Sequence, residues 1–190
     1  IIIFSDEIYS RQIFDDKEMP SFFNYPELKD RIIILDGWSK TYAMTGWRLG
    51  WSYWPEKCIE HIVKLITNSV SCVNVPTQYA GIAALDGPDD SINLMMNEFT
   101  QRRNLIHKLL NDLPGVECSL PGGAFYAFPN VKGTGMSGAE FAKKCMYEAG
   151  VAIVPGTAFG RNAEDFARFS FAASTDNISQ ALESIKKMLG

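Results

Sequence analysis

The 190-residue sequence contains only four cysteines and two histidines, and it lacks any run of basic residues. Cys58, Cys72, Cys118 and Cys145 are widely and irregularly spaced, and no two of them form a Cys-x-x-Cys pair. This spacing argues against a disulfide framework or a zinc site and favours four free, buried thiols in a reducing cytosol. We therefore expect a cytoplasmic protein without a metal site.

Long apolar segments are also missing. Runs such as 1–4 and 32–35 have the length of strands, far short of the roughly 20 residues that span a bilayer. No charged segment followed by an apolar one opens the chain, so we recognise no secretory signal. The net charge of −4, from 18 basic and 22 acidic residues, gives binding to nucleic acid or an anionic membrane no electrostatic support.

The composition is that of an ordinary globular protein, with 46% hydrophobic and 21% charged residues. The length suits one good core or two modest ones. Because the chain starts at Ile1, inside a predicted strand and without a methionine, we expect a fragment, a processed product or an incomplete chain.

The order of elements predicts an α/β fold. Two buried strands, at 1–4 and 32–35, end in polar residues, and in open α/β sheets ligands bind at that carboxyl edge. A shorter strand is predicted at 49–54. Helices follow from Pro55, from Pro76 and beyond the turn at 87–91, the last ending at Pro114-Gly115.

The remainder is typical of a small α+β unit. Ser137 and Glu140 form a capping box for a helix that ends before Gly150, and a second helix closes the chain. Further strands are predicted at 116–120, 124–128, 151–154 and 166–171. The expected domains are residues 1–86, an interdomain helix at 87–112, and a small C-terminal domain at 113–190.

Two cations follow the second buried strand. Lys40 is costly to desolvate as a cation unless it is paired or neutralised, and a Schiff base to an aldehyde removes the charge by covalent chemistry. Arg48, eight residues later, is flanked by glycines that let a ligand approach, and its planar fork suits a phosphate. Taken separately, each is more often a surface charge.

Together, 37–40 and 45–51 resemble the lysine-attachment motif of class I (fold type I) aminotransferases, which depend on pyridoxal 5'-phosphate (PLP). In that motif a small residue precedes the Schiff-base lysine, and an arginine follows within Gly-x-Arg-x-Gly. The resemblance implies that Lys40 holds PLP and that Ser39 and Arg48 help to bind it. Trp38 departs from the pattern, since the family more often has a smaller side chain there.

Two further segments extend the resemblance. Residues 5–9 resemble the family's S/D-E-x-Y strand end, which implies that Asp6 pairs with the pyridine nitrogen of PLP and that Tyr9 hydrogen-bonds its ring oxygen. Alone, such a segment is more often a structural cap. Residues 167–171 resemble the strand whose arginine binds the substrate carboxylate, which implies that role for Arg168. A salt bridge within the small domain is the alternative.

The three motifs occur in family order and cover essentially the whole chain. They imply the C-terminal half of an aspartate-aminotransferase-like enzyme: part of a large PLP domain, with a mostly parallel mixed sheet and helices on both faces, plus a small α+β domain. The implied activity is ping-pong transfer of an amino group between an L-amino acid and a 2-oxo acid by a homodimer, with Lys40 shuttling the proton.

Aspartate is the substrate implied first; alanine, aromatic and branched amino acids stay open. A PLP-dependent lyase or synthase on the same scaffold is an alternative, as is a non-catalytic regulatory module that binds PLP. We expect the 190 residues alone to be inactive, because half of the cofactor's surroundings would be missing.

Overall fold

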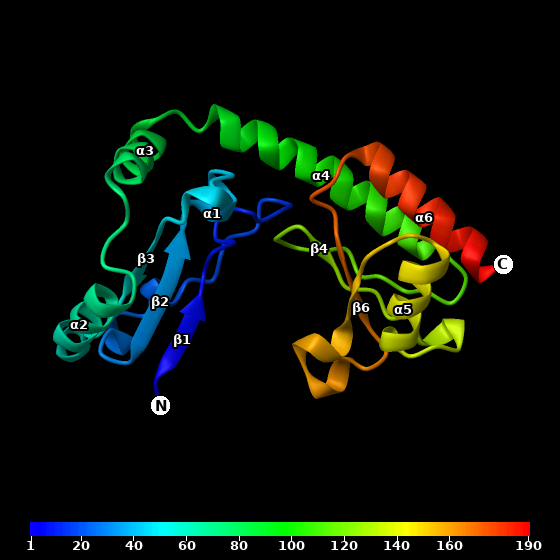
Figure 1. Cartoon of the computed structure of the whole chain (residues 1–190), viewed down its shortest axis with the longest axis horizontal. Helices are drawn as coiled ribbons and strands as arrows, with labels where there is room; N and C mark the ends of the chain where they lie inside the picture. Colours follow the sequence, from blue (N-terminus) through cyan, green and yellow to red (C-terminus); the bar gives the residue numbers. More distant parts are fainter. The chain divides into compact units, whose positions relative to one another are not determined.

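The computed structural model describes residues 1–190 and divides into two compact units, Ile1–Asn93 and Leu94–Gly190 (Figure 1). Each unit combines helices with a three-stranded sheet, so the chain has an α/β fold with two small sheets. The division falls within the long helix α4 (Asp90–Asn111). None of the helices is both long and apolar enough to cross a membrane.

The sheet of the first unit is mixed and has the order β1-β2-β3, with β2 in the centre. β1 (Ile3–Asp6) runs parallel to β2 (Ile32–Gly37), and β3 (Gly50–Tyr53) runs antiparallel to β2. The three isoleucines that open β2 are at most 9% exposed. A continuous β-branched run of this kind suits a central strand covered on both faces, which is why the sequence predicts it well.

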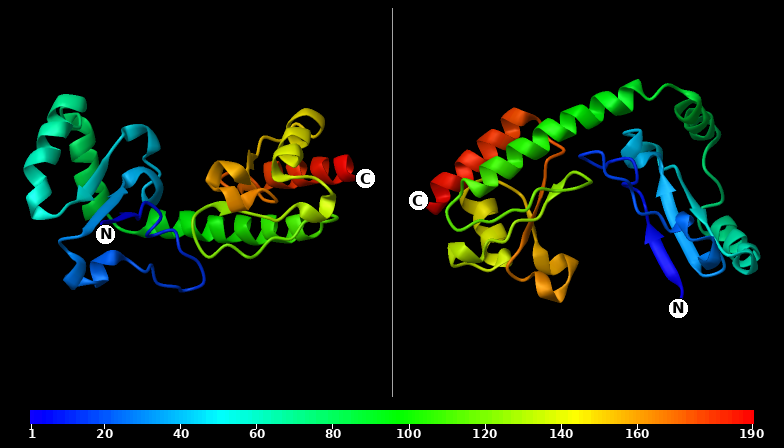
Figure 2. Two further views of the ribbon diagram at one scale, coloured as in Figure 1. Left: turned by 90° about the horizontal axis from the view of Figure 1, so that it is seen from below. Right: turned by 180° about the vertical axis from the view of Figure 1, so that it is seen from behind.

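Helices follow the strands of the first unit. The short α1 (Trp38–Thr41) comes directly after β2, and α2 (Ile59–Ser69) and α3 (Val75–Asp86) follow β3. In Figures 1 and 2, α2 lies beyond β3, on the side of the sheet opposite β1. The unit also has four 3-10 turns: Phe22–Asn24, Pro26–Leu28, Thr45–Trp47 and Glu56–Cys58.

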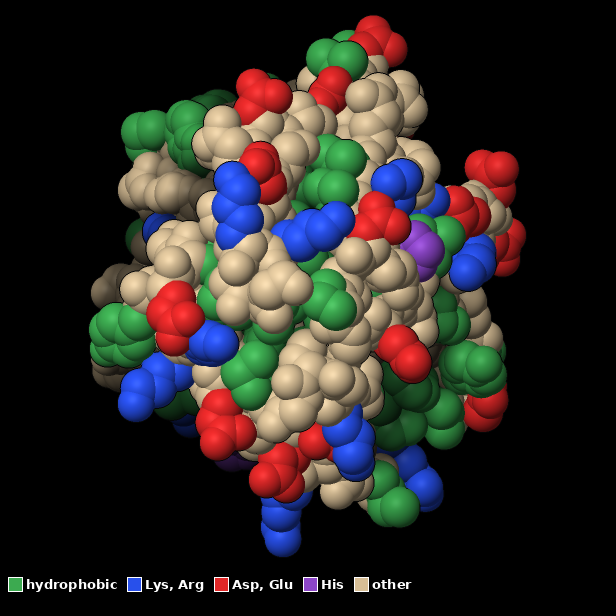
Figure 3. Space-filling model, turned by 90° about the vertical axis from the view of Figure 1, so that its right-hand side faces the viewer, with side chains coloured by type: hydrophobic (Ala, Val, Ile, Leu, Met, Phe, Trp, Pro, Cys, Tyr) green, Lys and Arg blue, Asp and Glu red, His purple; other side chains and the backbone are tan.

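The second unit contains an antiparallel sheet of order β4-β6-β5. Its elements are α4, β4 (Tyr126–Ala127), α5 (Gly138–Glu148), β5 (Val154–Pro155), β6 (Ala167–Ser170) and α6 (Thr175–Leu189), with 3-10 turns at Lys132–Thr134, Gly156–Phe159 and Arg161–Ala163. Figures 1 and 2 show α6 alongside the C-terminal part of α4. On the face drawn in Figure 3, acidic and basic side chains are interspersed.

Some strands predicted in this unit are wrong or too long. The segment at 116–120 makes only a single bridge, between Glu117 and Asn130, and the strand predicted at 124–128 is reduced to Tyr126–Ala127. Within the first of these segments, the Asn111 side chain accepts a hydrogen bond from the Cys118 amide and donates one to the Cys118 carbonyl, both 3.0 Å long. These backbone groups of Cys118 are therefore satisfied by a side chain and not by a neighbouring strand.

Two smaller predictions have clear outcomes. The capping box is confirmed, because the Ser137 hydroxyl accepts a hydrogen bond from the Glu140 amide while the Glu140 carboxylate accepts one from the Ser137 amide. The prediction of four buried thiols is wrong: Cys118 and Cys145 are buried, whereas Cys58 is half-buried and Cys72 is exposed. No disulfide joins the four cysteines.

Candidate active site

Lys40 lies on α1, immediately beyond the carboxyl end of β2, and its side chain is half-buried. Gly37 makes this arrangement possible, since a Cβ there would lie 2.8 Å from the Leu49 carbonyl oxygen. The close approach brings the segment before β3 against the start of α1, where the Trp38 amide donates to the Leu49 carbonyl at 3.2 Å. The backbone at the start of α1, two residues before Lys40, is therefore held against the segment before β3.

Asp6 and Tyr9 come to the same edge of the sheet. The parallel register of β1 and β2 places Asp6 opposite Leu35, and β2 continues for two more residues to Gly37, so the carboxyl ends of both strands lie at one edge. The Lys40 Nζ atom lies 5.9 Å from the centroid of the Tyr9 ring. Asp6 is exposed, and its Oδ1 atom accepts a hydrogen bond of 3.2 Å from the Ile8 amide, while Oδ2 has no donor in the chain. One carboxylate oxygen is thus available to a ligand.

Ser39 and Arg48 complete the set on the first unit. Ser39 is half-buried, and its hydroxyl has no hydrogen-bond partner in the chain. Arg48 has a left-handed backbone (φ 57°). Its guanidinium is exposed, and the Nη1 atom donates a hydrogen bond of 2.8 Å to the Thr45 carbonyl. The other N–H groups of that guanidinium have no acceptor in the chain, so it can still bind an anion.

Two neighbours of this edge were missed by the sequence reasoning. Gln12 is 2% exposed, and its Nε2 atom donates a hydrogen bond of 3.1 Å to the Lys40 carbonyl. Asp36 accepts hydrogen bonds from the Ser10 hydroxyl and the Gly37 amide, and burial raises its pKa, with Glu7 and Asp6 adding to the rise. No local pattern marks Gln12; Asp36, a carboxylate at a strand end, could have been suspected.

The donor set fits PLP. A carboxylate (Asp6), a phenol (Tyr9), a hydroxyl (Ser39), an amine (Lys40) and a guanidinium (Arg48) converge on one sheet edge. These are the groups that a protonated ring nitrogen, a ring oxygen, an aldehyde and a phosphate call for. The available Asp6 Oδ2 atom and the Ser39 hydroxyl are consistent with a site that is completed by a ligand.

Arg168 belongs to the second unit and lies on β6. Its guanidinium carbon is 4.3 Å from the centroid of the Tyr126 ring and 4.3 Å from that of the Phe159 ring. The predicted salt-bridge alternative does not occur within the chain, because no residue accepts a hydrogen bond or forms an ion pair with this guanidinium. The grouping of Arg168 with Lys40 stays a prediction, since the two residues lie in different units.

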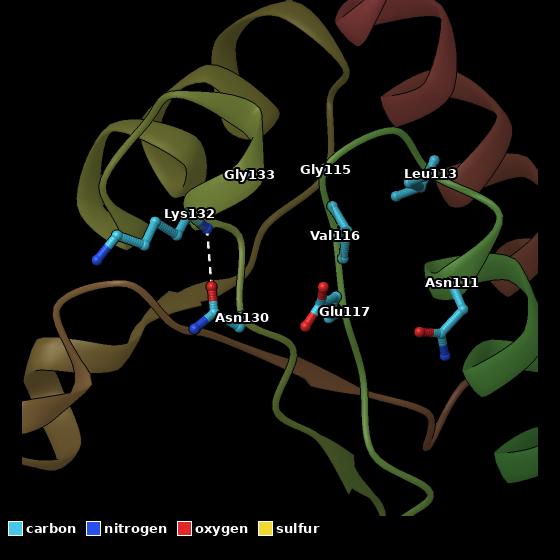
Figure 4. A pocket seen from close by; sticks show the side chains of 8 residues that line it. All are labelled: Asn111, Leu113, Gly115, Val116, Glu117, Asn130, Lys132 and Gly133. Atoms are coloured by element: carbon cyan, nitrogen blue, oxygen red, sulfur yellow. Dashed lines mark hydrogen bonds between the residues drawn. The ribbon is translucent and has the colours of Figure 1, made fainter.

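A hollow of about 550 Å³ in the second unit is a weaker candidate (Figure 4). Its Asn111 side chain bonds the backbone of Cys118, and the Asn130 carboxamide oxygen accepts a hydrogen bond from the Lys132 amide. The Lys132 ammonium is paired with Asp165 at 3.1 Å. Because these polar groups already bond to the chain itself, the hollow has few hydrogen-bonding groups left for a ligand.

Comparisons with known proteins identify the family of the chain. The family described as "Aminotransferase class I and II" matches residues 1–185. An aspartate aminotransferase of Pyrococcus horikoshii is 38% identical over 194 residues, spanning 100% of this chain and 48% of that protein. A (5-formylfuran-3-yl)methyl phosphate transaminase of Methanocaldococcus jannaschii is 39% identical over 188 residues, spanning 98% and 50%.

Among solved structures, an aromatic aminotransferase from Pyrococcus horikoshii OT3 superimposes with a TM-score of 0.95 at 37% identity, covering 100% of this chain and 51% of that one. The chain spans about half the length of the curated relatives it matches. The family match covers nearly every residue, including all of the candidate site residues. The chain therefore belongs to the aminotransferase class I and II family, whose members depend on PLP.

Proposed function

We propose that this chain carries the lysine-bearing part of a PLP-dependent aminotransferase that moves an amino group between an L-amino acid and a 2-oxo acid in a ping-pong reaction. The observation that carries the proposal is the position of Lys40, with its amine 5.9 Å from the Tyr9 ring at the edge where β1 and β2 end. In this proposal residues 1–86 belong to a large PLP domain, 87–112 to an interdomain helix and 113–190 to a small domain. The working enzyme would be a cytoplasmic homodimer.

Each residue of the sheet edge has one task. Lys40 would hold the cofactor covalently, Asp6 would pair with its ring nitrogen, and Tyr9 would donate to its ring oxygen. Ser39 and Arg48 would bind its phosphate, for which a hydroxyl and a planar guanidinium are suited. When bound, PLP supplies an electron-accepting ring that stabilises the charge left when a proton leaves the substrate Cα.

Lys40 would also move the proton. An amine released by the incoming amino acid is a base that can take the proton from the substrate Cα and return it elsewhere. The Gln12 hydrogen bond to the Lys40 carbonyl fixes the backbone from which this side chain works. A fixed backbone keeps the amine within reach of the same atom in every turnover.

Arg168 would bind the substrate α-carboxylate. Its guanidinium has no acceptor in the chain, although its backbone lies in a strand with buried Ala167 and Phe169 on either side. A half-buried cation without an anionic partner is stabilised by an anionic ligand. A carboxylate matches the spacing of the guanidinium fork and would form two parallel hydrogen bonds with it.

The relatives' names do not narrow the substrate, since they include aspartate, aromatic-amino-acid and furan-phosphate transaminases. Aspartate is the first amino acid to assay, followed by alanine, aromatic and branched amino acids. Product analysis separates the reaction classes. A 2-oxo acid together with an aminated acceptor supports transfer, whereas loss of a β- or γ-substituent would replace the proposal with a lyase.

The lysine is tested by borohydride reduction of the PLP-loaded, full-length protein, followed by intact mass and peptide mapping. We expect one adduct, on Lys40, and its loss in Lys40→Ala together with a drop in turnover of at least about a hundredfold. Lys57→Ala, which removes an exposed lysine of the same unit, is the matched control and should retain both adduct and turnover. An adduct on another lysine, or substantial turnover by Lys40→Ala, would refute the assignment.

A further inference from the structure

The two aromatic rings beside Arg168 have no role in the site as described so far. Along β6 exposure alternates, with Ala167 and Phe169 buried and Arg168 directed to the other face. On that face the guanidinium lies between contacts with Tyr126 and Phe159, each at 4.3 Å. A cation over an aromatic face at this distance is well inside the range of about 6 Å for a favourable cation–π contact.

Strand pairing explains the position of Tyr126. The antiparallel register of β4 and β6 places Tyr126 opposite Ser170, two residues beyond Arg168 and therefore on the same face. Tyr126 is thus a diagonal cross-strand neighbour of Arg168, at a separation that aromatic and long side chains span.

A glycine explains the position of Phe159. β5 pairs with β6 through Val154 and Arg168, and the 3-10 turn Gly156–Phe159 follows β5 at once. A Cβ on Gly156 would lie 2.2 Å from the Ala163 carbonyl oxygen, so only glycine lets this turn close against the segment before β6. The turn then delivers Phe159 to the guanidinium.

We propose that Tyr126 and Phe159 form an aromatic clamp that positions Arg168 for the α-carboxylate of the substrate and so makes the enzyme selective for amino acids over simple amines. The proposal rests on the carboxylate-binding role proposed for Arg168. Rings flanking a guanidinium restrict its rotation without using its N–H groups, and none of those groups is bonded to the chain. The fork is held in place while its hydrogen-bonding edge stays available.

The clamp acts before any chemistry. A long arginine side chain that is already ordered loses less conformational freedom when the carboxylate binds, so its contribution appears in substrate affinity. Tyr126 and Phe159 are therefore positioning residues, and their removal should raise KM while leaving kcat nearly unchanged. A purely structural role would instead lower the amount of folded, PLP-loaded enzyme or reduce kcat.

The test compares Phe159→Leu and Tyr126→Leu, which remove a ring but keep apolar bulk, with Tyr126→Phe, which keeps the ring. In the PLP-loaded, full-length enzyme we expect each leucine variant to raise KM for the amino acid about tenfold, with kcat changed less than about twofold. Tyr126→Phe should restore the wild-type KM. Tyr147→Leu is the matched control, because Tyr147 is an exposed aromatic residue on α5 of the same unit and contacts neither Arg168 nor the two rings.

A substrate without a carboxylate isolates the clamp from general damage. The leucine variants should react with a primary amine of the same side chain as fast as the wild type does. Adding Phe159→Leu to Arg168→Leu should also raise KM no further than Arg168→Leu alone. Equal losses with amine and amino acid, or an unchanged KM for the amino acid, would overturn the clamp.

The experiments distinguish a failure of the clamp from a failure of the carboxylate-binding role proposed for Arg168. If Arg168→Leu leaves KM for the amino acid unchanged, the carboxylate role is wrong and the clamp falls with it. If Arg168→Leu raises KM but neither ring variant does, only the clamp is wrong. A readout independent of activity is the NMR signal of the Arg168 Nε–H group, which ring currents should shift in the wild type and which should move towards the free-arginine position in Phe159→Leu.

Discussion

Ser10 and Asp36 lie 26 residues apart in the chain, and the Ser10 hydroxyl donates a hydrogen bond of 3.0 Å to Asp36 Oδ2. The Gly37 amide donates a second bond, of 2.6 Å, to Asp36 Oδ1. One carboxyl group therefore joins the segment after β1 to the end of β2, four residues before Lys40. This joint holds the two strand ends together where the cofactor residues are expected.

Asp36 should make stability depend on pH. Burial raises the pKa of Asp36 above its ordinary 3.8, and the nearby carboxylates Glu7 and Asp6 raise it further. The folded state therefore holds this proton more tightly than the unfolded state, and stability is lost as pH rises from about 3.8 through the raised pKa. In Asp36→Asn this loss is absent. Denaturant unfolding between pH 3 and 7 should therefore show that the unfolding free energy of the variant rises relative to that of the wild type as pH increases.

Ser10→Ala provides the control for that experiment. The Ser10 hydrogen bond lowers the pKa of Asp36, so removing it should raise this pKa and extend the pH window upward. Parallel stability curves for the wild type and Asp36→Asn would contradict the prediction.

The four thiols should react at very different rates. Burial raises the pKa of Cys145 to about 12, and it also raises the pKa of Cys118, whereas Cys72 is exposed. At pH 8 only about one Cys145 thiol in ten thousand is then ionised, and the thiolate is the reactive form. Iodoacetamide labelling followed by peptide mass analysis should modify Cys72 first and Cys145 only after unfolding. Early labelling of Cys145 in the folded protein would contradict its burial.

The capping box of α5 should stabilise the second unit. Ser137→Ala removes the side-chain oxygen that accepts from the Glu140 amide, and losses of this kind cost about 1 kcal/mol of unfolding free energy. Ser179→Ala is a suitable control, because that hydroxyl only donates to the Thr175 carbonyl on the exposed side of α6. Denaturant unfolding should show a clear loss for Ser137→Ala and a much smaller change for the control.

The same box has a pH signature. Hydrogen bonds from the Ser137 amide and hydroxyl lower the pKa of Glu140 below its ordinary 4.5. The stabilisation is then complete above about pH 4.5 and is lost as pH falls through the lowered pKa. The difference between wild type and Glu140→Gln should shrink in that range; a difference that does not vary with pH would remove Glu140 from the box.

The sequence was most informative where local chemistry decides the structure. The β-branched run of β2, the capping residues of α5 and the spacing from Lys40 to Arg48 are all readable over a few residues. Contacts made by distant segments were not readable. Asn111 bonds both backbone groups of Cys118, in a segment where a strand was predicted, and no propensity reports such a contact.

The surroundings of Arg168 show the same limit. The motif identified the arginine, but its neighbours depend on the register of β4 against β6 and on the turn that follows Gly156. Register is set by the whole sheet, so Tyr126 and Phe159 stand out only once the strands are paired. Gln12 likewise bonds to the Lys40 carbonyl across a sequence separation of 28 residues, which no motif covers.

Helix α2 has no buried side chain in this chain, and Ile59, Val63 and Ile66 are all more than 40% exposed. An 11-residue helix is marginal in water without packing, whereas α5 is of equal length and buries Phe141 and Cys145 completely. Amide protons of α2 in these 190 residues should therefore exchange with solvent far sooner than those of α5. We therefore expect the α2 helix to depend on a further surface that covers its apolar stripe.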